Sequence, residues 1–167
     1  MNRRSFMGTL TGVGVASVGV LLSVPLLRFA LYPMFLETSG TGWSDLGAVA
    51  ELKNLTFPTQ RSIKVEQLDG WRKVVSERTV YIIQGADGMF RVLSPVCPHL
   101  GCMIGWDVSR KQFVSPCHGG IFNSDGTLVA GPPRRAMDEL ESKVEQDHLL
   151  VRYQYFQPLL PTKQALS

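Results

Sequence analysis

Five side chains that can bind metal or exchange electrons fall within a short stretch of this chain of 167 residues. They are Cys97, His99, Cys102, Cys117 and His118. Three cysteines are too few for a disulfide scaffold, and because the number is odd, at least one thiol is free, bound to a metal or paired between chains. Scattered cysteines are usually small buried hydrophobes. These cysteines lie instead in short Pro/Gly-rich segments that a core strand would not tolerate, so metal chemistry is the leading hypothesis.

The sequence alone allows several roles for the histidines. His99 and His118 are either ordinary loop histidines, ligands of a zinc ion in a Cys/His site, or ligands of a redox centre. A zinc site would leave the neighbouring glycines and a later proline-rich loop unexplained. His148 has no such neighbours in the sequence, and we expect it to be a surface histidine.

The pattern of these segments identifies a family. Residues 97–102 read C-P-H-L-G-C (box one), residues 115–120 read S-P-C-H-G-G (box two), and residues 131–133 read G-P-P (the proline loop). They resemble the cluster boxes and proline loop of the Rieske proteins of cytochrome bc and b6f complexes, over most of residues 90–153. The resemblance implies a [2Fe–2S] cluster held by loops within residues 95–122. It implies ligand roles for Cys97, His99 and His118, and a disulfide between Cys102 and Cys117.

The fourth expected ligand departs from the family pattern. The family has cysteine where this chain has Ser115. An alkoxide is a harder and more basic ligand than a thiolate, so we expect serine to weaken cluster retention. Three hypotheses follow: the cluster is held through the Ser115 oxygen, Cys117 replaces Ser115 as ligand and leaves Cys102 free, or the cluster is absent.

The resemblance also bears on the reduction potential. Two neutral imidazoles raise a [2Fe–2S] potential to about −150 to +300 mV, against about −400 mV for an all-cysteine plant-type cluster. Other family members often carry a serine and a tyrosine whose hydroxyls raise the potential further, at the positions of Gly120 and Phe122. Neither residue can donate such a bond from its side chain. We therefore expect a potential at the low end of the range, suited to menaquinol.

The amino-terminal region reads as a membrane anchor. Residues 5–27 carry no charge and are long enough to cross a bilayer as a helix. Arg3 and Arg4 precede them in a twin-arginine pattern. We expect a twin-arginine region at 1–7, an anchor at 8–36 with a kink at Pro25, and a tether at 37–55. Because no clear cleavage site follows, we favour an uncleaved single-pass anchor in a bacterial cytoplasmic membrane, with the soluble part on the periplasmic side.

The rest of the chain predicts an all-β domain at 56–157 and a short tail at 158–167. The net charge of +3 comes from the three arginines before residue 37, so the domain has no basic excess for nucleic acid. Short apolar runs separated by turn formers predict an antiparallel sandwich or small barrel with a cluster-binding subdomain. Residues 139–144 are expected to be an irregular approach to the last strand. The predicted strands lie at 62–66, 79–83, 89–93, 103–106, 112–114, 120–122, 127–129 and 149–153.

The resemblance implies the Rieske electron-transfer subunit of a quinol:cytochrome c (or plastocyanin-like) oxidoreductase. Its partners would be a cytochrome b-type subunit, a cytochrome c-type subunit, quinol or menaquinol, and the membrane. The chain would then be a redox subunit and not an enzyme alone. Two alternatives stay open: a structural or assembly subunit that has lost its cluster, and the Rieske subunit of an arsenite-oxidase-like enzyme.

Overall fold

The computed structural model describes residues 2–31, 42–56, 58–69, 72–85 and 87–166. It divides into two units, which are treated separately: the amino-terminal helix and the β-rich head. The helix α1 (Arg3–Leu31) is 29 residues long, with a mean hydropathy of 2.0 in its most apolar window and no buried residue. At 1.5 Å per residue its length is about 44 Å, which exceeds a hydrocarbon core of about 30 Å.

This helix is long and apolar enough to be a single-pass membrane anchor. It starts within the expected twin-arginine region and continues through Pro25. The expected anchor end at 32–36 and the first part of the tether, 37–41, lie outside the described residues.

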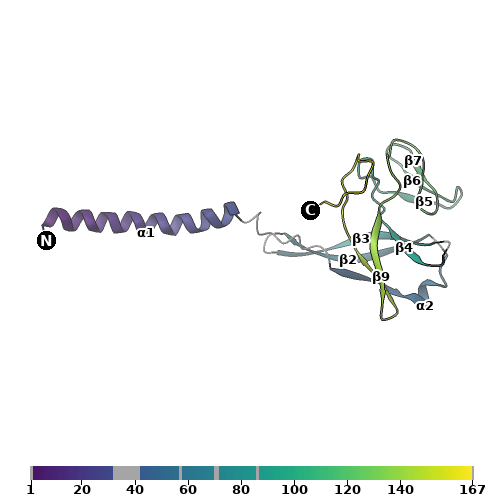
Figure 1. Cartoon of the computed structure of the whole chain (residues 1–167), viewed down its shortest axis with the longest axis horizontal. Coiled ribbons are helices and arrows are strands. Elements are labelled where there is room, and N and C mark those ends of the chain that lie inside the picture. Colours follow the sequence, from purple (N-terminus) through teal and green to yellow (C-terminus); the bar gives the residue numbers. More distant parts are fainter. Residues whose placement is uncertain (1, 32–41, 57, 70–71, 86, 167) are drawn as a thin grey trace. The chain divides into compact units, whose positions relative to one another are not determined.

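The head is built on two antiparallel sheets (Figure 1). The larger sheet has the order β1-β10-β9-β4-β3-β2, and the smaller sheet has the order β5-β6-β7-β8. The larger sheet contains β1 (Trp43–Ala48), β2 (Thr59–Asp69), β3 (Arg72–Gln84), β4 (Phe90–Leu93), β9 (Glu139–Glu145) and β10 (His148–Arg152). The smaller sheet contains β5 (Gly105–Asp107), β6 (Gln112–Ser115), β7 (Gly120–Phe122) and β8 (Leu128–Ala130). The predicted all-β antiparallel fold is confirmed.

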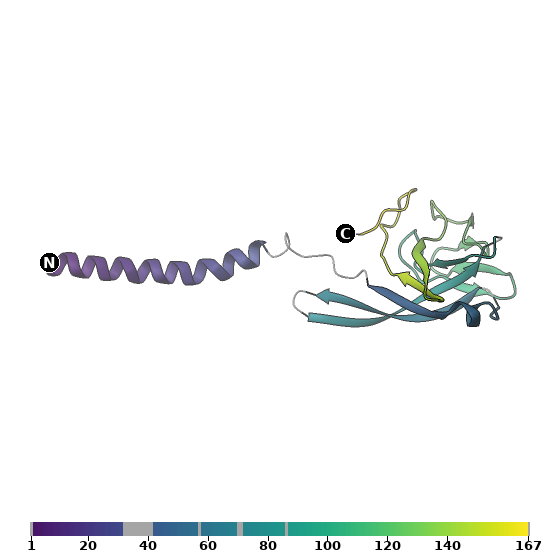
Figure 2. The ribbon, with the colours of Figure 1, turned by 60° about the horizontal axis from the view of Figure 1, so that its bottom comes forward.

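The larger sheet curls until its two edge strands meet, which makes it a nearly closed barrel. The Ser44 hydroxyl on β1 donates to the Lys64 carbonyl on β2, at 3.0 Å. Strands β2 and β3 form one long hairpin that is paired from Thr59 with Ile82 to Asp69 with Arg72 (Figure 2). Closure covers two sheet edges that would otherwise expose unpaired backbone groups.

Strand β3 is a wall shared by two cores. Because successive side chains point to opposite faces of a strand, Val80 and Ile82 enter the barrel core, while Tyr81 and Ile83 enter a second core. Phe113 and Phe122 of the small sheet are fully buried in that second core. The two boxes are thus carried on a subdomain that packs against the outside of the barrel.

Three expectations about boundaries differ from the structure. The domain starts by Trp43 and not at 56, because β1 pairs with β10 and the short helix α2 (Val49–Leu52) buries Leu52 in the barrel core. The expected tether at 37–55 is therefore too long. Residues 139–144 are not irregular, because β9 pairs with β4 on one side and β10 on the other. The tail at 158–167 folds back on the head through a bridge between Phe156 and Ala165.

Candidate functional site: a pair of loops tied by a disulfide

Box one is a loop between β4 and β5 that closes on itself. The Cys97 N–H donates to the Cys102 carbonyl at 2.8 Å, and the Gly101 N–H donates to the Cys97 carbonyl at 2.9 Å. Gly101 has a φ of +79°, a conformation that glycine adopts without a Cβ penalty. This tight loop buries the Cys97 side chain to 3% exposure and leaves Leu100 exposed.

Box two is the turn of the β6–β7 hairpin. Ser115 pairs with Gly120 at the last register position of the two strands. Gly119 turns the chain with a φ of +68°, and its N–H donates to the Ser115 carbonyl at 3.1 Å. As a result Cys117 and His118 are exposed at the turn, whereas Ser115 is buried at its base.

A disulfide between Cys102 and Cys117 joins the two boxes, with 6.4 Å between the Cα atoms. This distance lies within the usual range for disulfides. The His99 and His118 rings then lie edge to face, with their centroids 4.7 Å apart. The disulfide pairing implied by the resemblance is present. Because it occupies the Cys117 sulfur, the alternative in which Cys117 replaces Ser115 is not realised in this structure.

One ring nitrogen of His99 indicates that a group binds here. Its Nδ1 atom is buried and has no hydrogen-bond partner. Buried polar atoms are nearly always satisfied, and an unprotonated imidazole nitrogen is a metal ligand. The inward-facing nitrogen of His99 therefore fits an iron ligand.

The remaining donors fit a two-iron centre in part. Cys97 is the one cysteine outside the disulfide, and it supplies a buried thiol. Ser115 supplies a hydroxyl where a second thiolate is expected. Among the described residues, no three His, Cys, Asp or Glu side chains converge on a single ion. A [2Fe–2S] cluster does not require such convergence, because it divides its ligands between two irons.

The proline loop lies directly on box two. Gly131 has a φ of +105°, and a Cβ added to it would lie 2.7 Å from the Gly120 Cα and 2.8 Å from the Gly119 oxygen. A Cβ added to Gly120 would in turn lie 3.0 Å from the Pro133 side chain. Pro133 is buried. The proline loop therefore supports the backbone of box two.

Two aspartates brace the turns of the small sheet. Asp125 accepts hydrogen bonds from the Thr127 hydroxyl and N–H, which lower the pKa of its carboxyl. Asp107 accepts from the Ser109 hydroxyl and from the N–H groups of Ser109 and Arg110, and its pKa is also lowered. Burial raises the pKa of the Tyr81 hydroxyl, which lies in the core beneath the boxes.

Other polar residues that make short contacts lie outside the two boxes and the proline loop. His148 sits on the barrel, where its Nδ1 lies 2.8 Å from Asp45, away from both boxes in the chain and in the fold. Arg135 and Asp138 form a buried ion pair just after the proline loop. Opposite charges three residues apart were the signal for that pair, but such spacing is common on exposed surfaces.

Comparisons with known proteins agree with this geometry. A family model described as the Rieske [2Fe–2S] domain matches residues 43–147. The menaquinol:cytochrome c reductase iron–sulfur subunit of Geobacillus thermodenitrificans is 38% identical over 156 residues, 89% of each chain. The subunit of the same description from Bacillus subtilis (strain 168) is 36% identical over 155 residues, 89% of this chain and 90% of that one.

Among solved structures, the plasma-membrane Rieske protein of the cyanobacterium Synechocystis PCC 6803 matches with 24% identity and a TM-score of 0.42, covering 71% of this chain and all of that one. The family model spans both boxes and the proline loop, and the Geobacillus relative matches 89% of this chain. The chain belongs to the Rieske [2Fe–2S] family.

Proposed function

We propose that this chain is the electron-transferring iron–sulfur subunit of a membrane-bound menaquinol:cytochrome c reductase complex. The observation that carries the proposal is the His99–His118 pair, held edge to face at the end of two loops that a disulfide ties together. The relatives at 36–38% identity bear the names of such subunits. A Rieske domain implies a [2Fe–2S] cluster, which supplies a one-electron acceptor at a potential within reach of quinols.

We assign two ligands from the two boxes to each iron of that cluster. Cys97 and Ser115, both buried, are the ligands we assign to one iron. His99, through Nδ1, and His118 are the ligands we assign to the other. The exposed side chain of His118 is placed to accept a hydrogen bond from a quinol hydroxyl and to take its proton as the electron leaves.

The placement in the membrane follows from α1 and the twin-arginine pattern. The head lies outside the cytoplasmic membrane, anchored by one uncleaved span. It receives an electron beside a cytochrome b-type subunit and delivers it to a cytochrome c-type haem. Strand β1 begins at Trp43, so the proposed tether ends before this residue.

The serine at position 115, where a thiolate is expected, supports one competing function. A chain that keeps the fold, the disulfide and the anchor but binds no cluster would be a structural or assembly subunit of the same complex. The serine oxygen is a poor substitute for a thiolate, so cluster content separates the two functions.

The test is the cluster content of three forms of the full-length chain, made in cells that assemble iron–sulfur clusters and purified in detergent. Iron, acid-labile sulfide and the EPR spectrum of the reduced protein are measured. The wild type is expected to hold two irons and to lose them faster than Ser115→Cys, which restores the family ligand. Ser115→Ala is the matched control without a donor and is expected to retain no cluster.

The outcomes distinguish the proposals. A wild type without iron beside a loaded Ser115→Cys would establish the structural subunit instead. A wild type and a Ser115→Ala variant with equal iron and identical spectra would show that Ser115 is not a ligand. Absence of iron from all three forms would contradict the ligand assignment as a whole.

A further inference from the structure

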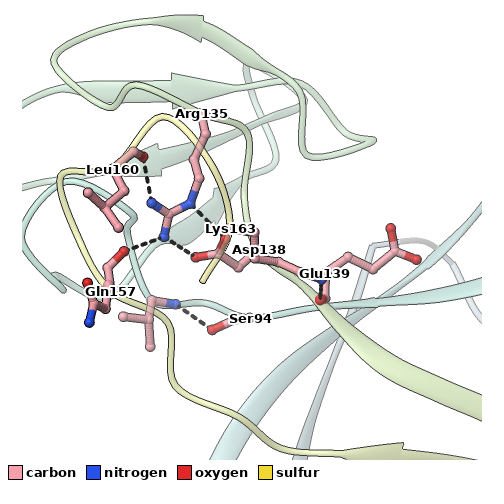
Figure 3. Close-up of polar contacts among 8 residues, drawn as sticks. Ser94, Arg135, Asp138, Glu139, Gln157, Leu160 and Lys163 are labelled. Atoms are coloured by element: carbon pink, nitrogen blue, oxygen red, sulfur yellow. Dashed lines mark hydrogen bonds and ion pairs between the residues drawn. The ribbon is translucent and has the colours of Figure 1, made fainter. Parts of the chain in front are cut away.

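Arg135 lies at the centre of a buried polar cluster just after the proline loop (Figure 3). Its Nε and Nη2 atoms donate to the two carboxylate oxygens of Asp138, both at 2.8 Å. Its Nη1 donates to the Leu160 carbonyl at 2.7 Å, and Nη2 also donates to the Gln157 carbonyl at 2.9 Å. The two charged side chains are only 8% and 5% exposed. The guanidinium thus joins the proline loop to the carboxy-terminal residues.

Those residues form a strap, defined here as residues 156–166, that folds back over the head. The Gln157 N–H donates to the Gln164 carbonyl at 2.9 Å, next to the Phe156–Ala165 bridge. The Lys163 ammonium donates to the Glu139 carbonyl at 2.8 Å. At the turn of the strap Leu159 has a φ of +64°, a strained conformation for a side chain of this type.

The strap makes a direct bond to box one. The Leu159 N–H donates to the Pro98 carbonyl at 2.9 Å, between Cys97 and His99 in the sequence. A cavity of about 90 Å³ separates the strap from box one, and Cys97, Pro98 and Pro158 are among its lining residues. Strap residues therefore line the same cavity as Cys97, whose side chain is 3% exposed.

The other partner of the ion pair holds the start of the same loop. The Asp138 carbonyl accepts the Ser94 N–H at 2.8 Å, and the Ser94 hydroxyl accepts the Val96 N–H at 3.3 Å. Box one is thus fixed at its start through Asp138 and at its middle through Leu159. The first connection is a backbone bond beside the β4–β9 pairing, next to the carboxylate that Arg135 binds. The second belongs to the strap, whose Gln157 and Leu160 carbonyls accept from Arg135.

We propose that Arg135 is a positioning residue, which holds box one closed over Cys97 by binding the strap and Asp138 at once. A buried pair is a poor source of net stability, but removing one partner leaves the other charge unpaired and is strongly destabilising for its surroundings. Loss of Arg135 should therefore release the strap and box one before the barrel unfolds. The consequence for the cluster rests on the proposed function, whereas the opening of box one does not.

The first measurement is the alkylation rate of Cys97 in the cluster-free, full-length chain with its disulfide intact. Cys97 is then the one reactive thiol. We expect Arg135→Gln to be labelled at least tenfold faster than the wild type without denaturant, and Arg135→Lys to lie between them. Arg91→Gln removes a comparable pair with Glu139 that is about 40% exposed, and its rate is expected to stay within twofold of the wild type.

A second control separates positioning from general stability. Val151→Ala weakens the barrel core, where Val151 is fully buried. Its labelling is expected to follow global unfolding and to rise with denaturant. Labelling of Arg135→Gln that follows its measured global unfolding in the same manner would overturn the proposal, as would a rate equal to that of the wild type.

The third measurement uses the loaded protein in the Ser115→Cys background. Release of box one is expected to change the EPR g-values and the midpoint potential in Arg135→Gln but not in Arg91→Gln. Unchanged g-values beside fast labelling would show that the loop opens without moving the ligands, which contradicts the positioning role. A wild type that binds no iron would contradict the proposed function and leave the labelling comparison intact.

Discussion

The local structure around Ser115 is held by contacts that do not involve its side chain. Its backbone is fixed by pairing with Gly120 and by the Gly119 N–H, and the neighbouring disulfide is formed. Serine and cysteine differ by one atom, and the backbone bonds that hold this position do not involve the side chain. In the proposed ligand set, cluster retention depends on the Ser115 oxygen, so a substitution at this one residue tests the function.

At Gly131, in contrast, the fold depends on the residue type, because the position has no room for a side chain. We expect Gly131→Ala to lower the free energy of unfolding by roughly 2–4 kcal/mol, combining a positive-φ penalty with overpacking against the backbone of box two. The measurement is guanidinium unfolding of the detergent-solubilised chain, followed by tryptophan fluorescence.

Gly88→Ala is the matched control for this substitution. Gly88 has a φ of +78°, but a Cβ there would meet nothing within 4 Å. It should cost only the backbone penalty, about 1 kcal/mol. Equal losses in the two variants would mean that the contact between the proline loop and box two carries no stability.

At the scale of elements, the β7–β8 turn gives the small sheet a dependence on pH. The hydrogen bonds from Thr127 depress the pKa of Asp125 in the folded state below its ordinary value of about 3.9. Because the folded pKa is the lower one, this stabilisation is present above about pH 4 and is lost as the pH falls through the folded value. We expect Asp125→Asn to be less stable than the wild type at pH 7, and we expect this difference to shrink as the pH falls through the folded pKa.

Thermal unfolding of both proteins between pH 2 and 7 is the measurement for this prediction. Thr127→Val removes the hydroxyl donor but keeps the carboxylate, so its difference from the wild type should show the same sign and a smaller pH dependence. A stability difference between wild type and Asp125→Asn that stays constant across this pH range would contradict the prediction. It would show that ionisation of Asp125 does not stabilise the folded turn.

The elements that the sequence could predict are those whose pattern is local. Alternating or β-branched runs at 62–66 and 79–83 lie inside β2 and β3, and the turn signal at 85–88 joins β3 to β4. Strand β9 was missed because Glu and Lys dominate it, and such residues disfavour strands. It is a strand because β4 and β10 pair with its two edges, which is a tertiary fact.

In the candidate site, too, local features could be predicted and features that depend on distant residues could not. The boxes could be found because their ligand types and spacing are fixed by chemistry, and the disulfide followed from the resemblance. The Arg135 cluster could not be found, since two of its acceptors are backbone carbonyls 22 and 25 residues away. No pattern of side-chain types reports where a distant carbonyl will lie.

For the whole molecule, the decisive property is the potential at which the head takes an electron. Phe122, at the position where other family members often have tyrosine, is fully buried in the core beneath the boxes. Gly120 offers no hydroxyl either, and Pro133 fills the space that a side chain there would need. We therefore expect the Ser115→Cys protein, in which cluster retention is secured, to have a midpoint below about +200 mV.

Phe122→Tyr tests the cause of this low potential. A hydroxyl that donates to the reduced cluster more strongly than to the oxidised one, by about 1–2 kcal/mol, would raise the midpoint by about 40–90 mV. Phe90→Tyr is the control, because it adds the same hydroxyl to a ring that packs on the barrel core and does not line the cavity beside box one. EPR-monitored redox titration of the three proteins in detergent gives the midpoints. A midpoint well above +200 mV in the parent protein would contradict the assignment of this chain to a low-potential quinol. Equal shifts in the two tyrosine variants would show that the missing hydroxyl at position 122 is not the cause of the potential.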